Sequence, residues 1–306
     1  MLEFLIFAGS LLALYYGAKA ITESAVHFAK VLGISEFIIG ATIVAFGTAL
    51  PEFSTSLAAM ILDGGRPEVA AGNVLGSILA NTCLALGAAA ALYGIYIDRK
   101  ILDTDLSFLL ASVIALYIVF LDYRITWMEG IFLIGIYLAF IHHEVSEHRK
   151  NDSSGTEELR PKMVALFAAG VVVLVVGARY MIASIGDIAA TLGVSEAVVA
   201  VILVAVGTSL PEVSTAIVAA KNGRGDIAMG NIVGANAFNA LIILGASSLV
   251  GDVAVREPFV AVTLPVVVLS TVLLGFMVMG NKITRFEGSM LLALYVLVVM
   301  AILSIL

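Results

Sequence analysis

Long, unbroken apolar runs are the feature that most limits how this chain can fold. An apolar helix needs roughly 20 residues to cross a bilayer, and about ten runs are close to that length or longer. They do not alternate apolar and polar residues as the strands of a membrane β-barrel do. We therefore predict membrane-spanning helices at residues 2–22, 36–62, 68–96, 104–122, 127–145, 162–182, 196–220, 227–250, 258–280 and 285–306.

The composition agrees with a membrane protein. Of the 306 residues, 61% are apolar and only 13% are charged, whereas soluble domains are about 45–50% apolar and about 25% charged. This excludes a soluble enzyme and predicts an all-α polytopic membrane protein. The net charge of −7 forms no basic face, so nucleic acid is not expected as a partner. The single cysteine, Cys83, cannot form an internal disulfide, and we interpret it as a packing residue.

One hydrophilic stretch, residues 142–162, divides the chain near its midpoint. It contains His142, His143 and His148, which we interpret as part of a solvated loop rather than as a metal or pH sensor. The chain then consists of a first five-span repeat at 1–145, a short connector at 146–161 and a second five-span repeat at 162–306.

The basic residues predict the orientation, because cytoplasmic loops carry an excess of lysine and arginine. Twelve of the 16 follow the odd-numbered spans: Lys19, Lys30, Arg99, Lys100, Arg149, Lys150, Arg160, Lys162, Lys221, Arg224, Lys282 and Arg285. Four follow the even-numbered spans: Arg66, Arg124, Arg179 and Arg256. We expect a cell-membrane protein with a cytoplasmic connector and both termini extracellular.

The two halves repeat each other. The matching segments are 17–36 with 177–196, 47–56 with 207–216, 72–87 with 230–245, and 126–137 with 284–295. Because each half has an odd number of spans, the second copy enters the membrane from the opposite side, which predicts inverted repeats around a midplane substrate site. The last pair of segments opens with Thr-x-x-Glu, a capping box at a helix start.

Glu52 and Glu212 lie at equivalent positions deep in apolar runs, each within a Gly-Thr-x-Leu-Pro-Glu motif. An acidic side chain at mid-membrane costs at least about 2.5–3.5 kcal/mol, so it normally faces a polar cavity and a partner. The lysines and arginines lie at the span ends, which disfavours an ion pair inside the membrane. A bound cation is the remaining partner.

The prolines of these motifs predict broken helices. Pro51 and Pro211 have no amide hydrogen and clash with the preceding turn, which opens the helix. We expect the carbonyl groups from Ala45 to Thr48, and from Ala205 to Thr208, to lose their helical partners and to line a cavity. Carbonyl, hydroxyl and carboxylate oxygens together suit a hard cation.

The third matching pair carries small and amide residues on one helical face of each copy. These are Asn73, Gly76, Ser77 and Asn81 in the first copy, and Asn231, Gly234, Ala235 and Asn239 in the second. The amides could coordinate a cation or form hydrogen bonds between helices. Asn81 and Asn239 are the preferred ligand candidates.

GTALPE and GTSLPE, each followed by GN-x-x-G-x-x-x-x-N, resemble the paired α-repeats of the sodium/calcium exchanger family, over essentially the whole chain. The resemblance implies a ten-span antiporter, not an enzyme, that exchanges Ca²⁺ for Na⁺ by alternating access. It implies Ca²⁺, Na⁺ and the lipid bilayer as partners, without a cofactor or an obligate protein partner.

The resemblance also implies roles for individual residues. Glu52 and Glu212 would share a central Ca²⁺, with oxygen from Thr48 and Thr208. Flanking sodium sites would use the carbonyl groups of Ala45 and Ala205 and the serine hydroxyls.

The chain departs from the family pattern at Ala49 and Ala235, where family members often carry serine, and at Asn239, where some carry aspartate. By the resemblance the two alanines belong to a sodium site beside Glu52, whereas Ser209 and Ser77 remain beside Glu212. We hypothesise that one sodium site is weakened.

Other functions remain open at this point. A proton/calcium exchanger could use the same two glutamates, and the missing hydroxyls favour it to some degree. Transport of another divalent ion is a related alternative. A cation channel is disfavoured because the broken helices suggest no open pore, and an intramembrane enzyme is disfavoured because the spans contain no histidine-rich metal motif and no Ser/His pair.

Overall fold

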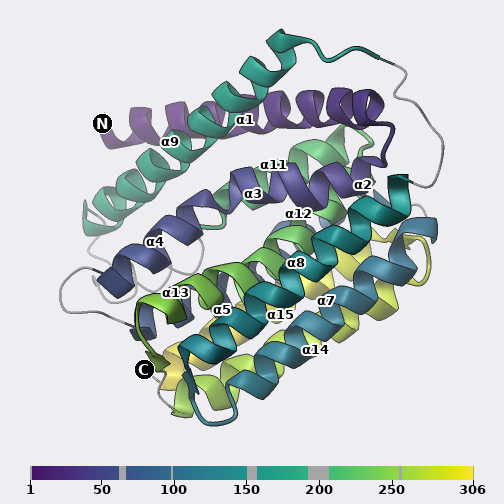
Figure 1. Ribbon diagram of the computed structural model, residues 1–306. Coiled ribbons are helices and arrows are strands. Elements are labelled where there is room, and N and C mark those ends of the chain that lie inside the picture. The colour runs from purple at the N-terminus through teal and green to yellow at the C-terminus, as the bar shows by residue number, and fades with distance from the viewer. Residues whose placement is uncertain are drawn as a thin grey trace.

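The protein is a bundle of long helices with four two-residue strands at its ends (Figure 1). This computed structural model describes residues 2–61, 67–97, 99–149, 157–191, 207–254 and 257–305. The first half contains α1 (Leu2–Leu32), α2 (Glu36–Ile39), η1 (Gly40–Val44), α3 (Ala45–Thr48), α4 (Leu50–Ile61), α5 (Pro67–Leu79), η2 (Ala80–Ala85), α6 (Leu86–Tyr93), β1 (Ile95–Tyr96), α7 (Arg99–Val119), β2 (Arg124–Ile125) and α8 (Trp127–Arg149). The second contains α9 (Pro161–Thr191), α11 (Leu210–Lys221), α12 (Gly225–Ala237), η3 (Phe238–Ile243), α13 (Leu244–Val250), β3 (Val253–Ala254), α14 (Glu257–Val278), β4 (Lys282–Ile283) and α15 (Arg285–Ile305). The η elements are π-helical turns.

Two continuous helical rods form the centre of the bundle. They are α5–η2–α6 and α12–η3–α13, and in their most apolar stretches 78% and 94% of the residues are buried. The corresponding shares are only 28% for α1 and 22% for α9, which lie against each other on one flank of the bundle (Figure 1). The central rods carry the third matching pair of sequence segments, so the polar face predicted there lies inside the protein.

Small residues allow the helices to approach closely. A Cβ atom at Gly17 of α1 would lie 2.9 Å from the Cβ atom of Leu174, and one at Gly177 of α9 would lie 2.9 Å from that of Ala13. At the centre, a Cβ atom at Gly234 of α12 would collide with the backbone of Ala41 in η1. Without a hydrophobic driving force between helices in lipid, such close backbone packing is a main source of helix association.

The outermost helices are longer than the sequence patterns predict. We place spans at 2–22 and 162–182, whereas α1 and α9 have 31 residues each. The polar residues Lys19 and Arg179 do not stop a helix, and they lie on α1 and α9 rather than in loops. Helix α1 ends only at Gly33, whose φ of 65° suits glycine, and the Ile34 N–H donates to the Ala29 carbonyl group to close the end.

In the part of the chain that the structure describes, fewer helices than the predicted ten are long and apolar enough to span a membrane. Within the residues that the structure describes, five helices are long and apolar enough to cross a bilayer. A sixth is the pair Glu36–Thr48 and Leu50–Ile61, bent by 46°. Shorter apolar helices cover Phe108–Val119 and Trp127–His142. The first part of the predicted span at 196–220, residues 196–206, lies outside the described ranges, and the ten-span count remains a prediction.

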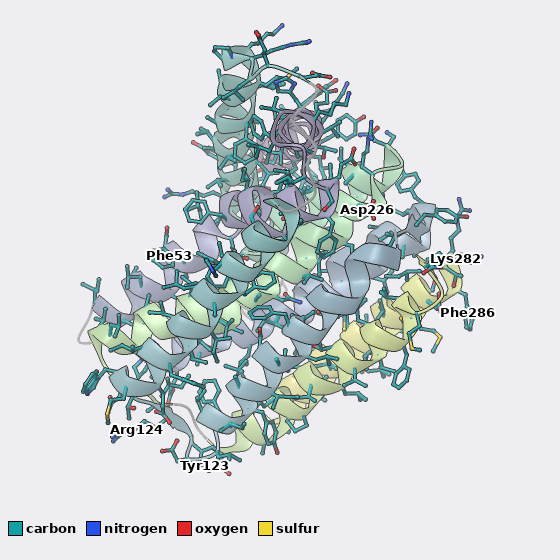
Figure 2. All side chains as sticks on the ribbon, turned by 45° about the vertical axis from the view of Figure 1, so that its right-hand side comes forward. Phe53, Tyr123, Arg124, Asp226, Lys282 and Phe286 are labelled. Carbon is teal, nitrogen blue, oxygen red and sulfur yellow. The ribbon has the colours of Figure 1, made fainter. Side chains whose placement is uncertain are left out.

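The strands join the two halves at both ends of the bundle. β1 of the first half pairs with β4 of the second, and β2 of the first half pairs with β3 of the second, both antiparallel. Figure 2 shows Tyr123 and Arg124 at the end of the bundle opposite to Lys282. Arg124 forms an ion pair with Asp252 at 3.2 Å, which reinforces the β2–β3 contact.

Both predicted capping boxes are confirmed. The Thr126 N–H and hydroxyl donate to the Glu129 carboxylate at 2.8 Å, and those of Thr284 donate to Glu287 at 2.7 Å. The two boxes lie at the starts of α8 and α15, the helices that follow β2 and β4. Each gives a partner to an amide donor that would otherwise lack one.

The end of the connector is attached to α1 through a buried histidine. The His27 ring is 5% exposed, and its Nε2 atom accepts from the backbone N–H of Arg160 at 3.2 Å. Its Nδ1 atom must therefore carry the proton, and it lies 3.1 Å from a carboxylate oxygen of Glu157. Lys30 also donates to Glu157, at 3.3 Å, and this bond holds the pKa of the Glu157 carboxyl below its usual value.

Replacing His27 tests whether this attachment stabilises the fold. We expect His27→Ala to lower the free energy of unfolding by about 1–3 kcal/mol, because two partners lose a buried hydrogen-bonding group. Thermal unfolding in detergent measures the effect. Lys30→Ala should have a much smaller effect, since the lysine side chain is 54% exposed and water replaces its contact. Equal losses in the two variants would contradict this account.

Replacing Gly234 tests the close packing at the centre. We expect Gly234→Ala to destabilise the protein by about 1–3 kcal/mol or more, because the added methyl group meets the Ala41 backbone, which cannot rotate away. Gly135→Ala on α8 is the matched control, since a Cβ atom there has nothing within 4 Å. In unfolding measurements the control should match or exceed the wild type, because alanine favours helix more than glycine does.

Candidate functional site

The two repeated glutamates lie in the first turns of α4 and α11, directly after a break in the helix. Ala49 precedes α4 with φ and ψ of −83° and 4°, and Ser209 precedes α11 with −85° and 5°. These nearly identical conformations confirm the predicted break before each proline. Helix starts carry a partial positive charge, which stabilises the carboxylates there. Glu52 and Glu212 have no exposed surface.

Crossed hydrogen bonds connect the breaks to the opposite half of the chain. The Thr48 hydroxyl donates to the side-chain oxygen of Asn231 at 3.1 Å. In the same way the Thr208 hydroxyl donates to the side-chain oxygen of Asn73 at 3.2 Å. Each threonine precedes a break in one half, and each asparagine lies on a central rod of the other half. The two halves are therefore joined at the breaks by an equivalent pair of contacts.

The first half holds its asparagine more firmly than the second does. The Asn73 amide nitrogen donates to the Ser56 hydroxyl at 2.9 Å and to the backbone carbonyl oxygen of Glu52 at 3.1 Å. The residue equivalent to Ser56 in the second half is Ala216, which has no hydroxyl. Accordingly, the Asn231 amide nitrogen has no hydrogen-bond partner among the described residues. The two sides of the site therefore differ in their hydrogen bonding.

The π-helical turns carry Asn81 and Asn239. η2 and η3 occupy equivalent positions, and each asparagine is the second residue of its turn. Both residues are completely buried, yet neither the oxygen nor the nitrogen of either amide has a hydrogen-bond partner within the described part of the chain. Single π-turns inside helices occur often at functional sites. A neighbouring amide, Asn236, instead donates to Thr82 at 2.9 Å and connects the two rods.

Oxygen atoms without partners gather on these elements. In the described structure, both carboxylate oxygens of Glu212 and one of Glu52 are buried and accept no hydrogen bond. Buried polar atoms are normally paired, so these oxygens are candidate cation ligands. The described residues contain no group of three or more His, Cys, Asp or Glu side chains, so neutral oxygens would have to complete any cation site.

The expected position of Ser209 is wrong. The resemblance assigns Ser209 and Ser77 to the side of Glu212, whereas the Ser209 hydroxyl donates to a Glu52 carboxylate oxygen at 3.5 Å. Ser77 contacts the Thr208 hydroxyl of the other half at 3.3 Å. The reason is the crossing of the halves: the residues at the break before α11 face elements of the first half. Sequence offsets do not reveal that crossing.

The carbonyl group of Ala45 is not freed as predicted. It accepts the Ala49 N–H at 3.0 Å and the Thr48 hydroxyl at 3.3 Å. In a helix, each carbonyl group accepts a hydrogen bond from the N–H four residues later. Because Pro51 has no N–H, the carbonyl group that loses its partner is that of Gly47 and not that of Ala45. The equivalent candidate, Ala205, lies outside the described residues.

Together, the buried carboxylates, the broken helices and the apolar exterior define a multi-pass membrane transport protein. The comparisons agree. A family model described as sodium/calcium exchanger protein matches residues 2–144 and 162–304. The sodium/calcium exchanger MaX1 of Methanosarcina acetivorans is 32% identical, over 96% of both chains. The inner membrane protein YrbG of Escherichia coli is 32% identical over 78% of this chain and 77% of its own length.

A solved structure is also similar. The sodium-calcium exchanger NCX_Mj, soaked with zero Na⁺ and Ca²⁺, superposes with a TM-score of 0.86 at 29% identity, covering 98% of this chain and 99% of that one. The chain belongs to the sodium/calcium exchanger protein family. This is a family of membrane transporters, and membership supports a role in the exchange of Ca²⁺ and other cations.

Replacing Ser56 tests the asymmetry of the asparagines. We expect Ser56→Ala to lower the free energy of unfolding by about 1 kcal/mol, because the Asn73 amide loses an acceptor in a buried position. Ser54→Ala on the exposed side of the same helix is the control and should leave the unfolding free energy unchanged. Equal unfolding curves for the two variants would show that the hydrogen bond to Ser56 does not anchor Asn73.

Proposed function

We propose that this protein is a secondary antiporter that exchanges Ca²⁺ for Na⁺ by alternating access around Glu52 and Glu212. The observation that carries the proposal is the set of buried oxygens without partners at two equivalent helix breaks. Two ionised carboxylates balance the charge of one Ca²⁺, and carboxylate, hydroxyl and amide oxygens are the ligands that hard cations prefer. In this proposal Thr48, Thr208, Asn81 and Asn239 supply neutral oxygens.

We further propose that the halves are inverted repeats of five spans each. Three observations support this. The family model matches each half separately. A strand of the first half pairs with a strand of the second at each end of the bundle, and the two Thr–Asn hydrogen bonds also connect one half to the other. Inverted repeats bring two half-sites together near the midplane. The excess of basic residues after the odd-numbered spans supports a cytoplasmic connector.

In this proposal, the negative charge of the two glutamates couples the transport of one cation to that of the other. With the site empty, two carboxylates would lie uncompensated in a low dielectric, which is strongly unfavourable. The protein should therefore change access only when Ca²⁺, Na⁺ or another cation neutralises them, and this makes exchange obligatory.

Conservative replacement of either carboxylate tests the site. We expect Glu52→Gln and Glu212→Gln each to abolish calcium uptake into vesicles, while thermal unfolding shows a folded protein, because a neutral amide cannot balance the charge of Ca²⁺. Glu23→Gln, on the exposed face of α1, is the control and should transport normally. Uptake at the wild-type rate in either site variant would refute the proposal.

Proton coupling is the second candidate, and the absence of hydroxyls at Ala49 and Ala235 favours it. By the repeat, these residues are equivalent to Ser209 and Ser77. Since Ser209 contacts Glu52, we propose that the poorer side of the site lies beside Glu212, and not beside Glu52 as the resemblance implied. Calcium uptake driven in turn by a sodium gradient and by a proton gradient separates the candidates. Uptake driven by sodium alone supports sodium exchange, and uptake driven by protons alone supports the second candidate.

The weakened sodium site has its own test. We expect Ala49→Ser together with Ala235→Ser to increase the sodium dependence of calcium uptake, because two hydroxyl oxygens are restored to the poorer side. The slope of uptake rate against sodium concentration measures this. An unchanged slope would mean that the two alanines do not limit sodium binding.

A further inference from the structure

A pocket opens between α9 and α4, and Thr208 of the candidate site is one of its lining residues. Its cavity volume is about 540 Å³, which lies within the range of small-molecule sites, about 300–1,000 Å³. Val172 and Val176 on its rim are exposed, and on a membrane protein such an apolar surface faces lipid. The pocket is therefore open to the bilayer.

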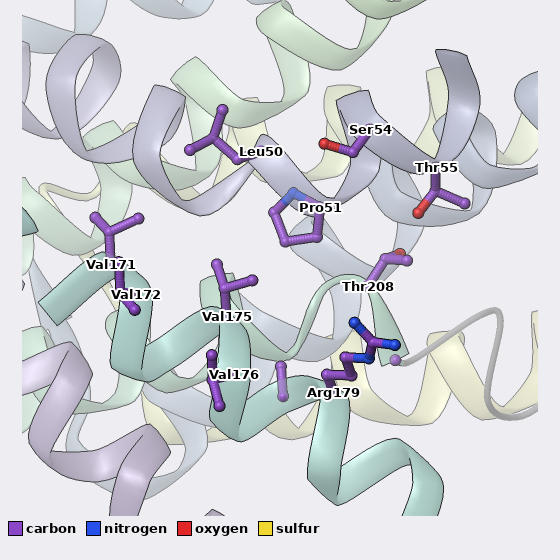
Figure 3. Close-up of a pocket in the computed structure, with 12 residues that line it drawn as sticks. Leu50, Pro51, Ser54, Thr55, Val171, Val172, Val175, Val176, Arg179 and Thr208 are labelled. Atoms are coloured by element: carbon purple, nitrogen blue, oxygen red, sulfur yellow. The ribbon is translucent and has the colours of Figure 1, made fainter. Parts of the chain in front are cut away.

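The pocket has a long apolar wall. Two successive turns of α9 face the first turn of α4 across it (Figure 3). The apolar lining residues are Val171, Val172, Val175 and Val176 of α9, and Leu50 and Pro51 of α4. Branched aliphatic side chains in this arrangement offer dispersion contacts to a flexible hydrocarbon chain but no hydrogen bonds.

One end of the pocket is polar and positively charged. Arg179 lies one turn beyond Val175 on α9, and Figure 3 shows its guanidinium group directed toward Thr208. The hydroxyl residues Ser54 and Thr55 line the same pocket. Among the described residues, no carboxylate lies within ion-pair distance of this guanidinium group. Arg179 is exposed, so its guanidinium group is free to bind an anionic group from outside the described protein.

The spacing of Arg179 and the valines along α9 matches the depth of one leaflet of a bilayer. Arg179 lies 18 residues after Pro161, about 27 Å along the helix axis. Val171 lies about 12 Å before Arg179. Since the hydrocarbon core is about 30 Å thick, Arg179 lies near the surface opposite to the connector, and Val171 lies near the middle. A lipid of that leaflet has its phosphate and its chain in this same order.

We propose that this pocket binds one anionic phospholipid, with its phosphate on Arg179 and an acyl chain against the valines. Arginine suits this role because its planar guanidinium group can form two parallel hydrogen bonds with a phosphate. The chain would lie against Pro51 and exclude water from that side of the break before α4. The positive charge argues against the pocket as a route for Ca²⁺. The proposal does not depend on ion exchange.

Native mass spectrometry of the delipidated full-length protein, titrated with phosphatidylglycerol or phosphatidylcholine, tests the proposal. We expect one phosphatidylglycerol to bind more tightly than the bulk of the lipid. Arg179→Gln should weaken this binding about tenfold, the loss expected for a charge-assisted hydrogen bond. Val175→Trp should fill the cavity and remove the tight binding. Because Arg179 is on the rim of the pocket, its replacement leaves the protein core intact, and a loss of lipid binding would not result from misfolding.

Matched controls lie on the same or comparable helices. Val173→Trp adds the same volume to α9 at an exposed position outside the pocket, and Arg285→Gln removes an exposed arginine at the start of α15. Both should bind phosphatidylglycerol as the wild type does. The proposal is overturned if Arg179→Gln binds as the wild type does, if both lipids bind equally, or if the controls lose as much binding as the pocket variants.

Discussion

Two carboxylates buried in an apolar interior are the constraint on which the rest of this structure depends. Neither Glu52 nor Glu212 has exposed surface, and three of their four oxygens have no hydrogen-bond donor within the described part of the chain. Burying such groups is costly unless helix starts and polar side chains stabilise the charged form, or a cation or a proton neutralises it. The breaks before Pro51 and Pro211 create the helix starts, and the glycine-rich central rods allow the two halves to approach.

The halves are joined through polar contacts at the breaks rather than through apolar packing alone. The Thr48–Asn231 and Thr208–Asn73 hydrogen bonds are equivalent, but only Asn73 is further held by a serine. The two similar halves thus differ in how many hydrogen bonds hold the asparagine at the break. The same asymmetry extends to the hydroxyls, since Ser209 contacts Glu52 whereas its counterpart in the repeat is Ala49.

Local sequence patterns predicted local features well. The breaks before the prolines and both capping boxes are present, because each depends on a few neighbouring residues and on backbone hydrogen bonding. Features that depend on distant partners were missed. The π-turns at Asn81 and Asn239 have no sequence signature, and Ser209 lies beside Glu52 rather than beside Glu212. Helices α1 and α9 extend past Lys19 and Arg179 because lysine and arginine favour helix and no proline follows them within these helices.

By itself, the sequence determined that the chain lies in a membrane, that it is helical, where its helices break and to which family it belongs. These follow from hydrophobicity, from proline geometry and from the repeated motifs, all of which are properties of short segments. Only the tertiary structure decided that Ser209 of the second half lies near the Glu52 carboxylate, and that Arg179 lines an apolar pocket. Those outcomes depend on how the two halves cross, and this crossing is set by close glycine contacts and by hydrogen bonds between residues more than 130 positions apart.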